Sequence, residues 1–222
     1  RGESLGILGE TGSGKSTILQ LLLRFYDPDE GAIYIEGTDI RSMNPDELYP
    51  RFGVVFQRDV LFAQSIRENI AFGRELGDDE ILRCLSFARA EDFVSALPGG
   101  MASRINARGM NLSGGQRQRL LIARALSPPS KGKGGPDILI LDDSSSALDY
   151  RTDAELRHSL DEHFKNTTKI IVAQRISSIK HASHILVLER GRVLGEGRHA
   201  ELLESCALYR EIHDSQMGDA HA

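Results

Sequence analysis

The nine residues from Gly9 to Thr17, GETGSGKST, constrain the fold of this chain more than any other stretch. They lie between the apolar run SLGIL (4–8) and the helix-periodic run ILQLLL (18–23), so we expect a strand to lead through a glycine-rich turn into a helix. The glycines free the backbone to curl until several N–H groups point inward, and the helix N-terminus adds positive potential. This geometry suits a polyphosphate group.

Two side chains of this loop have expected roles in phosphate chemistry. Lys15 supplies a point charge for β- and γ-phosphates, and the Ser16 hydroxyl is a candidate Mg²⁺ ligand. A solvated turn would match the loop pattern GxxxxGK(S/T) by chance in roughly 1% of chains of this length. The strand before the loop and the helix after it make a chance match rarer. The residues expected to bind a nucleotide are Gly9, Glu10, Thr11, Gly12, Ser13, Gly14, Lys15, Ser16 and Thr17.

Length and composition limit the classes of protein to which the chain can belong. With 222 residues, 40% of them apolar, it can bury a full core. Its net charge is −5 and its basic residues are scattered, so we expect no nucleic-acid partner. Cys84 and Cys206 are too far apart in sequence to indicate a metal pair, and we expect both to be reduced thiols.

The N-terminal end suggests that the sequence is part of a longer protein, because Arg1, Gly2 and Glu3 lead almost at once into the strand before the phosphate loop. No apolar run approaches the roughly 18 residues of a membrane span, and no signal peptide is recognisable. We expect this part of the protein to be soluble by itself.

Polar residues follow two further apolar runs. GVVFQ is expected to end a strand at Gln57, whose amide could reach a metal-bound water or could be an ordinary loop glutamine. The run Ile138–Leu141 is apolar without alternation, which is typical of a buried parallel strand, and Asp142 and Asp143 follow it. Carboxylates at that end of a strand lie where α/β sheets bind ligands, so Asp142 is a candidate Mg²⁺ ligand and Asp143 could contact an attacking water.

Residues 65–126 have helical periodicity, which predicts a helical lobe inserted into an α/β core. The lobe ends with LSGGQRQRLLIARAL, in which Ser113 is a candidate N-cap followed by two glycines. This second exposed helix N-terminus could accept an anion. One nucleotide does not easily fill two such sites on distant parts of a domain, so a site shared between two copies is expected. Alternating strands and helices elsewhere predict an α/β fold with a mostly parallel sheet.

Over essentially its whole length the chain resembles the nucleotide-binding domain of an ATP-binding cassette (ABC) transporter, which has a P-loop (RecA-like) core. Gly9–Thr17 resembles the Walker A loop, Gln57 the Q-loop and Ile138–Asp143 the Walker B strand. The signature of the family is matched by Leu112 and the following Ser113, Gly114, Gly115 and Gln116. Ser146–Asp149 resembles the D-loop, and Ala173–Ser177 resembles the switch.

LLLRFYDPDEG and LFAQSIRENIAFG are similar to stretches of multidrug, peptide and lipid exporters. The resemblance implies ATP and Mg²⁺ as ligands, with Ser16, Gln57 and Asp142 at the metal. It also implies head-to-tail pairing of two domains, in which each signature faces the opposite Walker A loop. The adenine-stacking aromatic residue of the family would lie upstream of this chain.

Three residues depart from the family pattern. Asp143 stands where efficient members carry Glu, Gln174 stands in the switch where they carry His, and Ala107 precedes Arg-Gly where exporters often have Glu. Asp is one methylene shorter than Glu, and a misplacement of about 1 Å can cost on the order of 100-fold in rate. Gln174 can donate a hydrogen bond to the γ-phosphate but, unlike His, cannot take up a proton and become positively charged. The first two changes weaken hydrolysis and leave binding intact.

We therefore interpret residues 1–222 as the ATP-binding domain of one half of a heterodimeric exporter, with a helical subdomain at about 65–126. The expected partners are a second, non-identical half-transporter and the coupling helices of a transmembrane domain, at the cytoplasmic face of a membrane. Asp143, Gln174 and Gln57 are the expected catalytic residues, and Asp149 is the D-loop aspartate. Alternatives are a homodimeric exporter with slow turnover through Asp143, a non-transport ABC ATPase, or an engineered hydrolysis-deficient variant.

Overall fold

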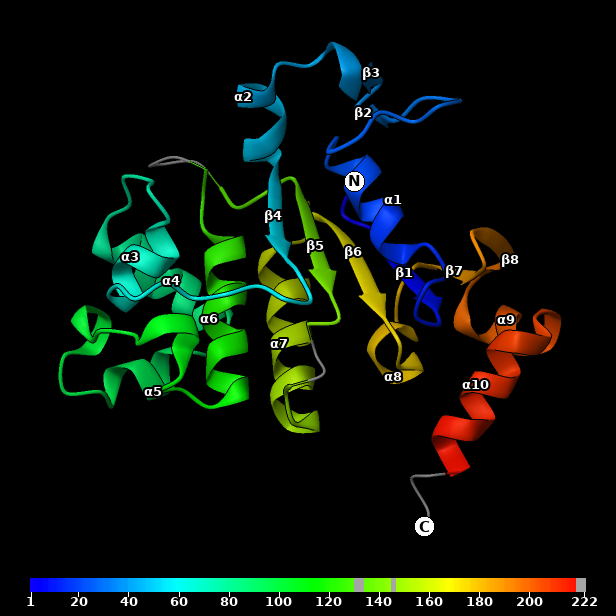
Figure 1. Cartoon of the computed structure of the whole chain (residues 1–222). Coiled ribbons are helices and arrows are strands. Elements are labelled where there is room, and N and C mark those ends of the chain that lie inside the picture. Colours follow the sequence, from blue (N-terminus) through cyan, green and yellow to red (C-terminus); the bar gives the residue numbers. More distant parts are fainter. Residues whose placement is uncertain (130–133, 145–146, 219–222) are drawn as a thin grey trace. The chain divides into compact units, whose positions relative to one another are not determined.

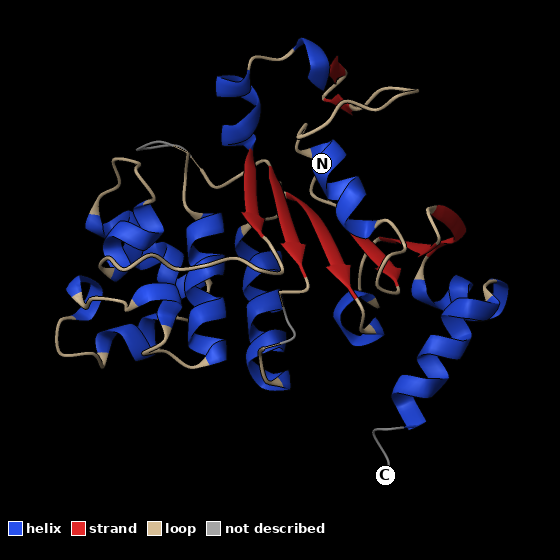
Figure 2. Ribbon diagram, viewed as in Figure 1, coloured by secondary structure: helices blue, strands red, loops and turns tan. Residues whose placement is uncertain are grey.

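The computed structural model describes residues 1–129, 134–144 and 147–218, and its elements are shown in Figure 1 and, by type of secondary structure, in Figure 2. The chain divides into two compact units. The first comprises residues 1–3 and 52–169, and the second comprises residues 4–51 and 170–222. Each unit is built around parallel strands.

The second unit carries the glycine-rich loop. Strand β1 (Ser4–Gly9) pairs in parallel with β7 (His184–Glu189), and Gly9 lies opposite Leu188. Strand β6 (Thr168–Ala173) lies on the other side of β1, and β8 (Arg192–Gly197) runs antiparallel to β7. The last four residues of β1 are buried, as expected for the central strand of this group.

The helices of this unit follow its strands. The main ones are α1 (Lys15–Leu22), α2 (Pro45–Leu48), α8 (Ile176–Ile179), α9 (His199–Ser205) and α10 (Ala207–Gly218). Two short strands, β2 (Tyr34–Ile35) and β3 (Thr38–Asp39), form a hairpin, and 3-10 turns cover Ile40–Ser42 and Tyr49–Arg51.

The first unit combines a parallel strand pair with several helices. Strand β4 (Phe52–Val55) pairs with β5 (Ile138–Asp142). The helices are α3 (Ile66–Ala71), α4 (Asp78–Phe87), α5 (Glu91–Ser95), α6 (Gly114–Leu126) and α7 (Tyr150–His163), with 3-10 turns at Gly100–Ala102 and Ala107–Gly109. Helix α6 passes so close to β4 that a Cβ at Gly53 would overlap the carbonyl of Ala125.

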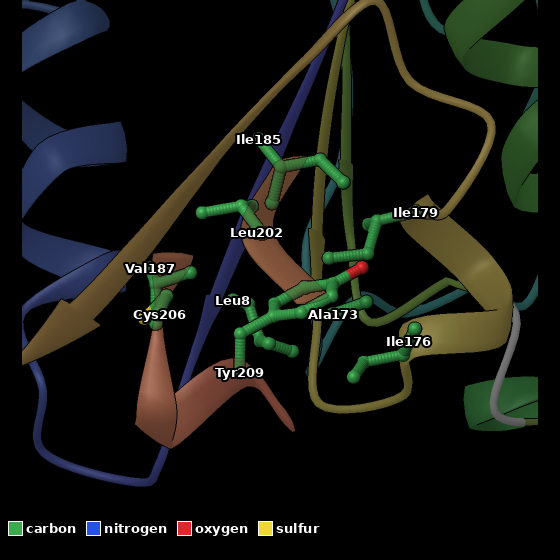
Figure 3. Packing of buried hydrophobic residues seen from close by; sticks show 9 residues of the cluster. All are labelled: Leu8, Ala173, Ile176, Ile179, Ile185, Val187, Leu202, Cys206 and Tyr209. Atoms are coloured by element: carbon green, nitrogen blue, oxygen red, sulfur yellow. The ribbon is translucent and has the colours of Figure 1, made fainter. Parts of the chain in front are cut away.

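One apolar cluster of the second unit joins its strands to the C-terminal helices. Its buried members, shown in Figure 3, are Leu8, Ala173, Ile176, Ile179, Ile185, Val187, Leu202, Cys206 and Tyr209. Tyr209 is fully buried, and its hydroxyl lies 2.7 Å from Nδ1 of His199. This burial raises the pKa of Tyr209 to about 12. Strands β1, β6 and β7 are thus packed against α8, α9 and α10.

Stability of this C-terminal packing is expected to fall with acidification. Burial lowers the pKa of His199, and positive charge on His213, Lys180 and His181 lowers it further. As the pH falls, the unfolded chain therefore binds more protons than the folded chain. The contribution of His199 to folding stability is present above the usual histidine pKa of about 6.5 and is lost as pH falls through the folded-state value.

Hydrogen exchange of residues 207–218, corrected for intrinsic rates, should accelerate between pH 7.5 and 5.5 more than exchange in α7 does. His199→Gln should reduce this pH dependence, because it removes the titrating ring. His158→Gln, which replaces an exposed histidine of α7, is the control and should leave the dependence unchanged. Equal pH dependence in all three proteins would contradict a role for His199.

The structure confirms the expected α/β class, and several boundaries differ from the sequence pattern. Strand β4 ends at Val55, so Gln57 lies in the following loop rather than at the end of the strand. Strand β8 was missed, because its exposed residues do not alternate in hydrophobicity.

Both cysteines are free and buried. Residues 65–126 are helical as expected and belong to a unit that also contains β4 and β5, and their separation as a subdomain stays a prediction. In the described ranges, no helix has the length and apolar character needed to cross a membrane.

Candidate functional site

The glycine-rich loop of the second unit has a backbone adapted to bind an anion. Gly12 and Gly14 have φ of 84° and 104°. These values lie in the left-handed region, which residues with a side chain rarely adopt. A Cβ at Gly9 would lie 2.5 Å from both the Leu188 carbonyl oxygen and Oγ of Ser13, so only glycine fits there. Gly14 precedes α1 and offers no side-chain cap. The first N–H groups of α1 therefore have no partner from a capping side chain.

Lys15 lies over this loop. Its Nζ donates hydrogen bonds to the carbonyl oxygens of Gly9 at 2.6 Å and Glu10 at 2.7 Å. The ammonium group is thereby held beside the uncapped end of α1, and Ser16 follows in the first turn of that helix. A cation and an open helix N-terminus in one loop fit a phosphate chain in chemistry and in shape.

A neighbouring turn supports the loop from a distant part of the sequence. Gly191, between β7 and β8, donates its backbone N–H to the carbonyl oxygen of Ser13 at 2.9 Å. A Cβ at Gly14 would lie 3.6 Å from Cα of Gly191, so the two backbones approach closely. The hydroxyl of Ser13 is buried and has no hydrogen-bond partner among the described residues. Sequence reasoning missed Gly191, which no local pattern marks.

The switch residue Gln174 also belongs to the second unit. It follows β6 directly, and its side chain is exposed. Its backbone carbonyl accepts a hydrogen bond of 2.9 Å from Nε2 of Gln216 on α10. Sequence reasoning did not single out Gln216.

The first unit brings Gln57 and the two aspartates to one end of its strand pair. Val55 lies opposite Leu141 in the parallel register. Gln57 and Asp143 are each two residues beyond this pair, and Asp142 is the last residue of β5. Side chains that could ligate a metal or contact a water therefore follow the carboxyl ends of neighbouring strands.

Asp143 has a left-handed backbone, with φ of 50°. Non-glycine residues rarely adopt this conformation, and Asp is one of those that tolerate it best. Such conformations often lie at functional sites, where the surrounding structure maintains them. The left-handed backbone at the end of β5 thus sets the direction in which the short side chain of Asp143 leaves the chain.

Buried Arg124 anchors the segment after Gln57 to α6. Its guanidinium donates to the carbonyl oxygens of Val60 at 2.9 Å and Asn69 at 3.1 Å, and it lies 3.4 Å from a carboxylate oxygen of Asp59. Burial lowers the pKa of Arg124, while Asp59 opposes this effect. The loop that carries Gln57 is therefore tied to the helix that begins at the signature residues.

The signature residues form the N-terminus of α6. Oγ of Ser113 accepts from the backbone N–H of Gln116 at 3.1 Å, and the N–H of Ser113 donates to Oε1 of Gln116 at 2.9 Å. This capping box fixes the start of the helix. Ser113 and Gly114 are exposed. The expected helix N-terminus free of bulky side chains is thus present.

The D-loop approaches this helix within the same unit. A Cβ at Gly115 would lie 3.3 Å from the carbonyl oxygen of Ala147, so a small residue is favoured there. Asp149 caps α7, because its carboxylate accepts from the backbone N–H of Thr152 at 2.9 Å and from the hydroxyl of Thr152 at 2.8 Å. These bonds lower the pKa of Asp149. Ser146, the first residue of the expected D-loop motif, lies outside the described residues.

Comparison with known proteins shows the family to which this chain is similar. Residues 1–146 match the ABC transporter family. The chain is 44% identical over 98% of its length to the uncharacterized ABC transporter ATP-binding protein YknU of Bacillus subtilis, of which it covers 36%. It is 40% identical over 97% of its length to the ATP-dependent lipid A-core flippase of Methylobacillus flagellatus, and again covers 36% of that protein.

A solved structure agrees in fold as well as in sequence. It is described as a bacterial Atm1-family ABC exporter with ATP bound, and it superposes with a TM-score of 0.90 at 39% identity. The match covers 97% of this chain and 37% of the exporter chain. The present chain therefore spans little more than a third of the length of these relatives.

Proposed function

Because this chain belongs to the ABC transporter family, as an ATP-binding domain of an exporter-type ABC ATPase, we propose that it acts in a pair of unequal sites. It holds MgATP at its own site, where hydrolysis is slow. It also completes the faster site of a partner chain with its signature residues. ATP binding closes the pair, and hydrolysis at the partner's site reopens it.

One combination of residues carries this proposal. Asp143 and Gln174 stand where efficient members of the family have Glu and His, while Ser113 to Gln116 keep the whole signature. The capping box and the exposed Ser113 and Gly114 support a working signature. In the head-to-tail arrangement of the family, Asp143 and Gln174 serve the ATP at this chain's own site, whereas the signature serves the ATP at the partner's site. A chain can therefore lose its own hydrolysis and still support that of a partner.

Binding at the chain's own site rests on the phosphate loop. We propose that Gly9–Thr17 surrounds the phosphates, with Lys15 at the β- and γ-phosphates, and that Ser16, Gln57 and Asp142 hold Mg²⁺. The metal would neutralise charge that develops on the phosphate oxygens. Asp143 would hold the attacking water from a greater distance than Glu would, and Gln174 would donate a hydrogen bond to the γ-phosphate.

The partners follow from the same reading. We propose a second, non-identical half-transporter and the coupling helices of a transmembrane domain, which place the chain at the cytoplasmic face of a membrane. Export of a substrate is the work of the whole assembly.

A homodimer with slow turnover through Asp143 is the second candidate, and the presence of an aspartate rather than an inert residue favours it. Purification of the full-length protein in ATP from its native membrane distinguishes the two, because the proposal requires a non-identical half to co-purify.

Ser113→Arg is expected to impair the ATPase activity of the full-length assembly more than Asp143→Asn does. The added bulk blocks the anion-accepting end of α6, which serves the faster site, whereas Asp143 serves the slow one. We expect a loss of about 100-fold for Ser113→Arg and of less than about twofold for Asp143→Asn. Steady-state ATPase assays on the purified assembly measure both.

The matched control is Ser65→Arg, because Ser65 caps α3 with the same kind of capping box, formed with Glu68. It removes a cap worth about 1 kcal/mol without touching the signature. Activity near that of the unmodified protein in this control shows that loss of a cap alone is not the cause. A larger loss for Asp143→Asn than for Ser113→Arg would overturn the assignment of roles.

A further inference from the structure

The C-terminal helix is hydrogen-bonded to the backbone of the switch. Gln216, on α10, binds on both sides of Arg175: its Oε1 accepts from the N–H of Ile176 at 2.9 Å, and its Nε2 donates to the carbonyl oxygen of Gln174 at 2.9 Å. We call Gln174–Ile176, which connects β6 to α8, the switch segment. One side-chain amide therefore holds both ends of this segment.

These bonds replace a missing local cap. The first N–H groups of a helix need partners from outside the helix, and a capping side chain normally provides one of them. Arg175 occupies the N-cap position of α8 and provides no side-chain hydrogen bond that caps the helix. Gln216 satisfies the first N–H of α8 instead. The start of α8 thus depends on a residue from another part of the chain.

The packing of α10 explains why Gln216 lies there. Tyr209, Ile212 and Gln216 are spaced three and four residues apart, so they share one face of the helix. Tyr209 is buried in the apolar cluster and Ile212 packs against it. The same cluster contains Ala173 and Ile176, which flank Gln174 and Arg175, and Figure 3 shows them near Tyr209. The contacts that order α10 therefore also bring Gln216 to the switch segment.

We propose that Gln216 is a positioning residue of the nucleotide site. It fixes the backbone of the switch segment, and thereby the direction in which the exposed side chain of Gln174 points toward the γ-phosphate. This inference rests on the proposed function, which gives Gln174 its contact with ATP. It adds that the rate at this site depends on the docking of α10, so that a change in the C-terminal helix alters hydrolysis without altering the phosphate loop.

The test replaces Gln216 with alanine in the full-length transporter. Without the side-chain amide, the N–H of Ile176 should exchange its hydrogen about tenfold faster, since one hydrogen bond contributes up to about 1.5 kcal/mol. Mass spectrometry of peptides covering residues 170–180 measures this exchange. Single-turnover hydrolysis at this chain's site, with the partner's site disabled, should slow about tenfold at saturating ATP, while the ATP concentration for half-maximal rate stays unchanged.

Two further variants control for a general loss of structure. Ser215→Ala alters the adjacent, exposed residue of α10 and should change neither exchange nor rate. Gln216→Glu keeps the size of the side chain and an acceptor for Ile176 but loses the donor to the carbonyl of Gln174. Its exchange and rate should lie between those of the unmodified protein and Gln216→Ala.

A double variant separates positioning from mere stabilisation. In a Gln174→Ala background, Gln216→Ala should cause no further loss of rate, because the side chain that it positions is already absent, although exchange is still accelerated. Losses that multiply would overturn the positioning role, and unchanged exchange in Gln216→Ala would overturn the contact itself. Failure of the proposed function would instead appear as fast hydrolysis at this site or as absent ATP binding, which these comparisons report separately.

Discussion

Replacing Lys15 with alanine is expected to lower the affinity of this chain for ATP by about 100-fold, since charge-assisted hydrogen bonds are worth about 1.5–3 kcal/mol. The Nζ of Lys15 lies within 2.7 Å of two loop carbonyls, where it is held beside the uncapped start of α1. No other cation of the loop Gly9–Thr17 can substitute for it, because that sequence contains a single Lys and no Arg. Binding should therefore be weakened even though the loop backbone is intact.

The measurement must report on this chain and not on its partner. Photoaffinity labelling of the full-length assembly with 8-azido-ATP, followed by separation of the two chains, does so. Lys165→Ala is the matched control, because it removes one exposed lysine from the other unit and changes the net charge equally. Labelling of the Lys15→Ala chain at the level of this control would refute the phosphate site.

Asp143→Glu combined with Gln174→His is expected to raise hydrolysis at this chain's own site on the order of 100-fold, because the carboxylate advances by one methylene toward the water. Histidine can also carry the proton and charge that Gln174 lacks. The backbone on which each side chain stands is already defined, by the left-handed conformation of Asp143 and by the hydrogen bond from Gln216 to Gln174. The first change therefore lengthens a side chain, and the second exchanges one for an imidazole, on a backbone that is already defined.

Single-turnover hydrolysis with the partner's site disabled measures this gain. Each single variant should give a smaller gain than the pair, because the two groups act in one step. Asp92→Glu with Gln174→His is a control that lengthens an exposed carboxylate of α5, in the same unit as Asp143, and we expect no more gain from it than from Gln174→His alone. If the Asp143→Glu and Gln174→His pair also gives no gain, the slowness originates elsewhere, for example in the partner's signature.

Features whose parts are close together in the sequence could be predicted from it. The strand, turn and helix around Gly9–Thr17, the capped start of α6 at Ser113, and the buried strand before Asp142 are each determined by a few consecutive residues. Their patterns of glycine, capping residues and apolar runs follow from local backbone geometry. The end of β4 was the weakest of these predictions, because an apolar run does not show where pairing stops, and Phe56 continues the run beyond the strand.

The amino-acid sequence alone thus predicted the chemistry of this chain: a loop for phosphates, carboxylates for a metal, a signature, and two substitutions expected to weaken hydrolysis. Only the tertiary structure decided what holds these groups in place. The N–H of Gly191 supports the loop at Ser13, and Gln216 reaches Gln174 across 42 residues of chain. Such contacts depend on the packing of buried side chains such as Tyr209, which brings distant segments together, and no local spacing encodes that outcome.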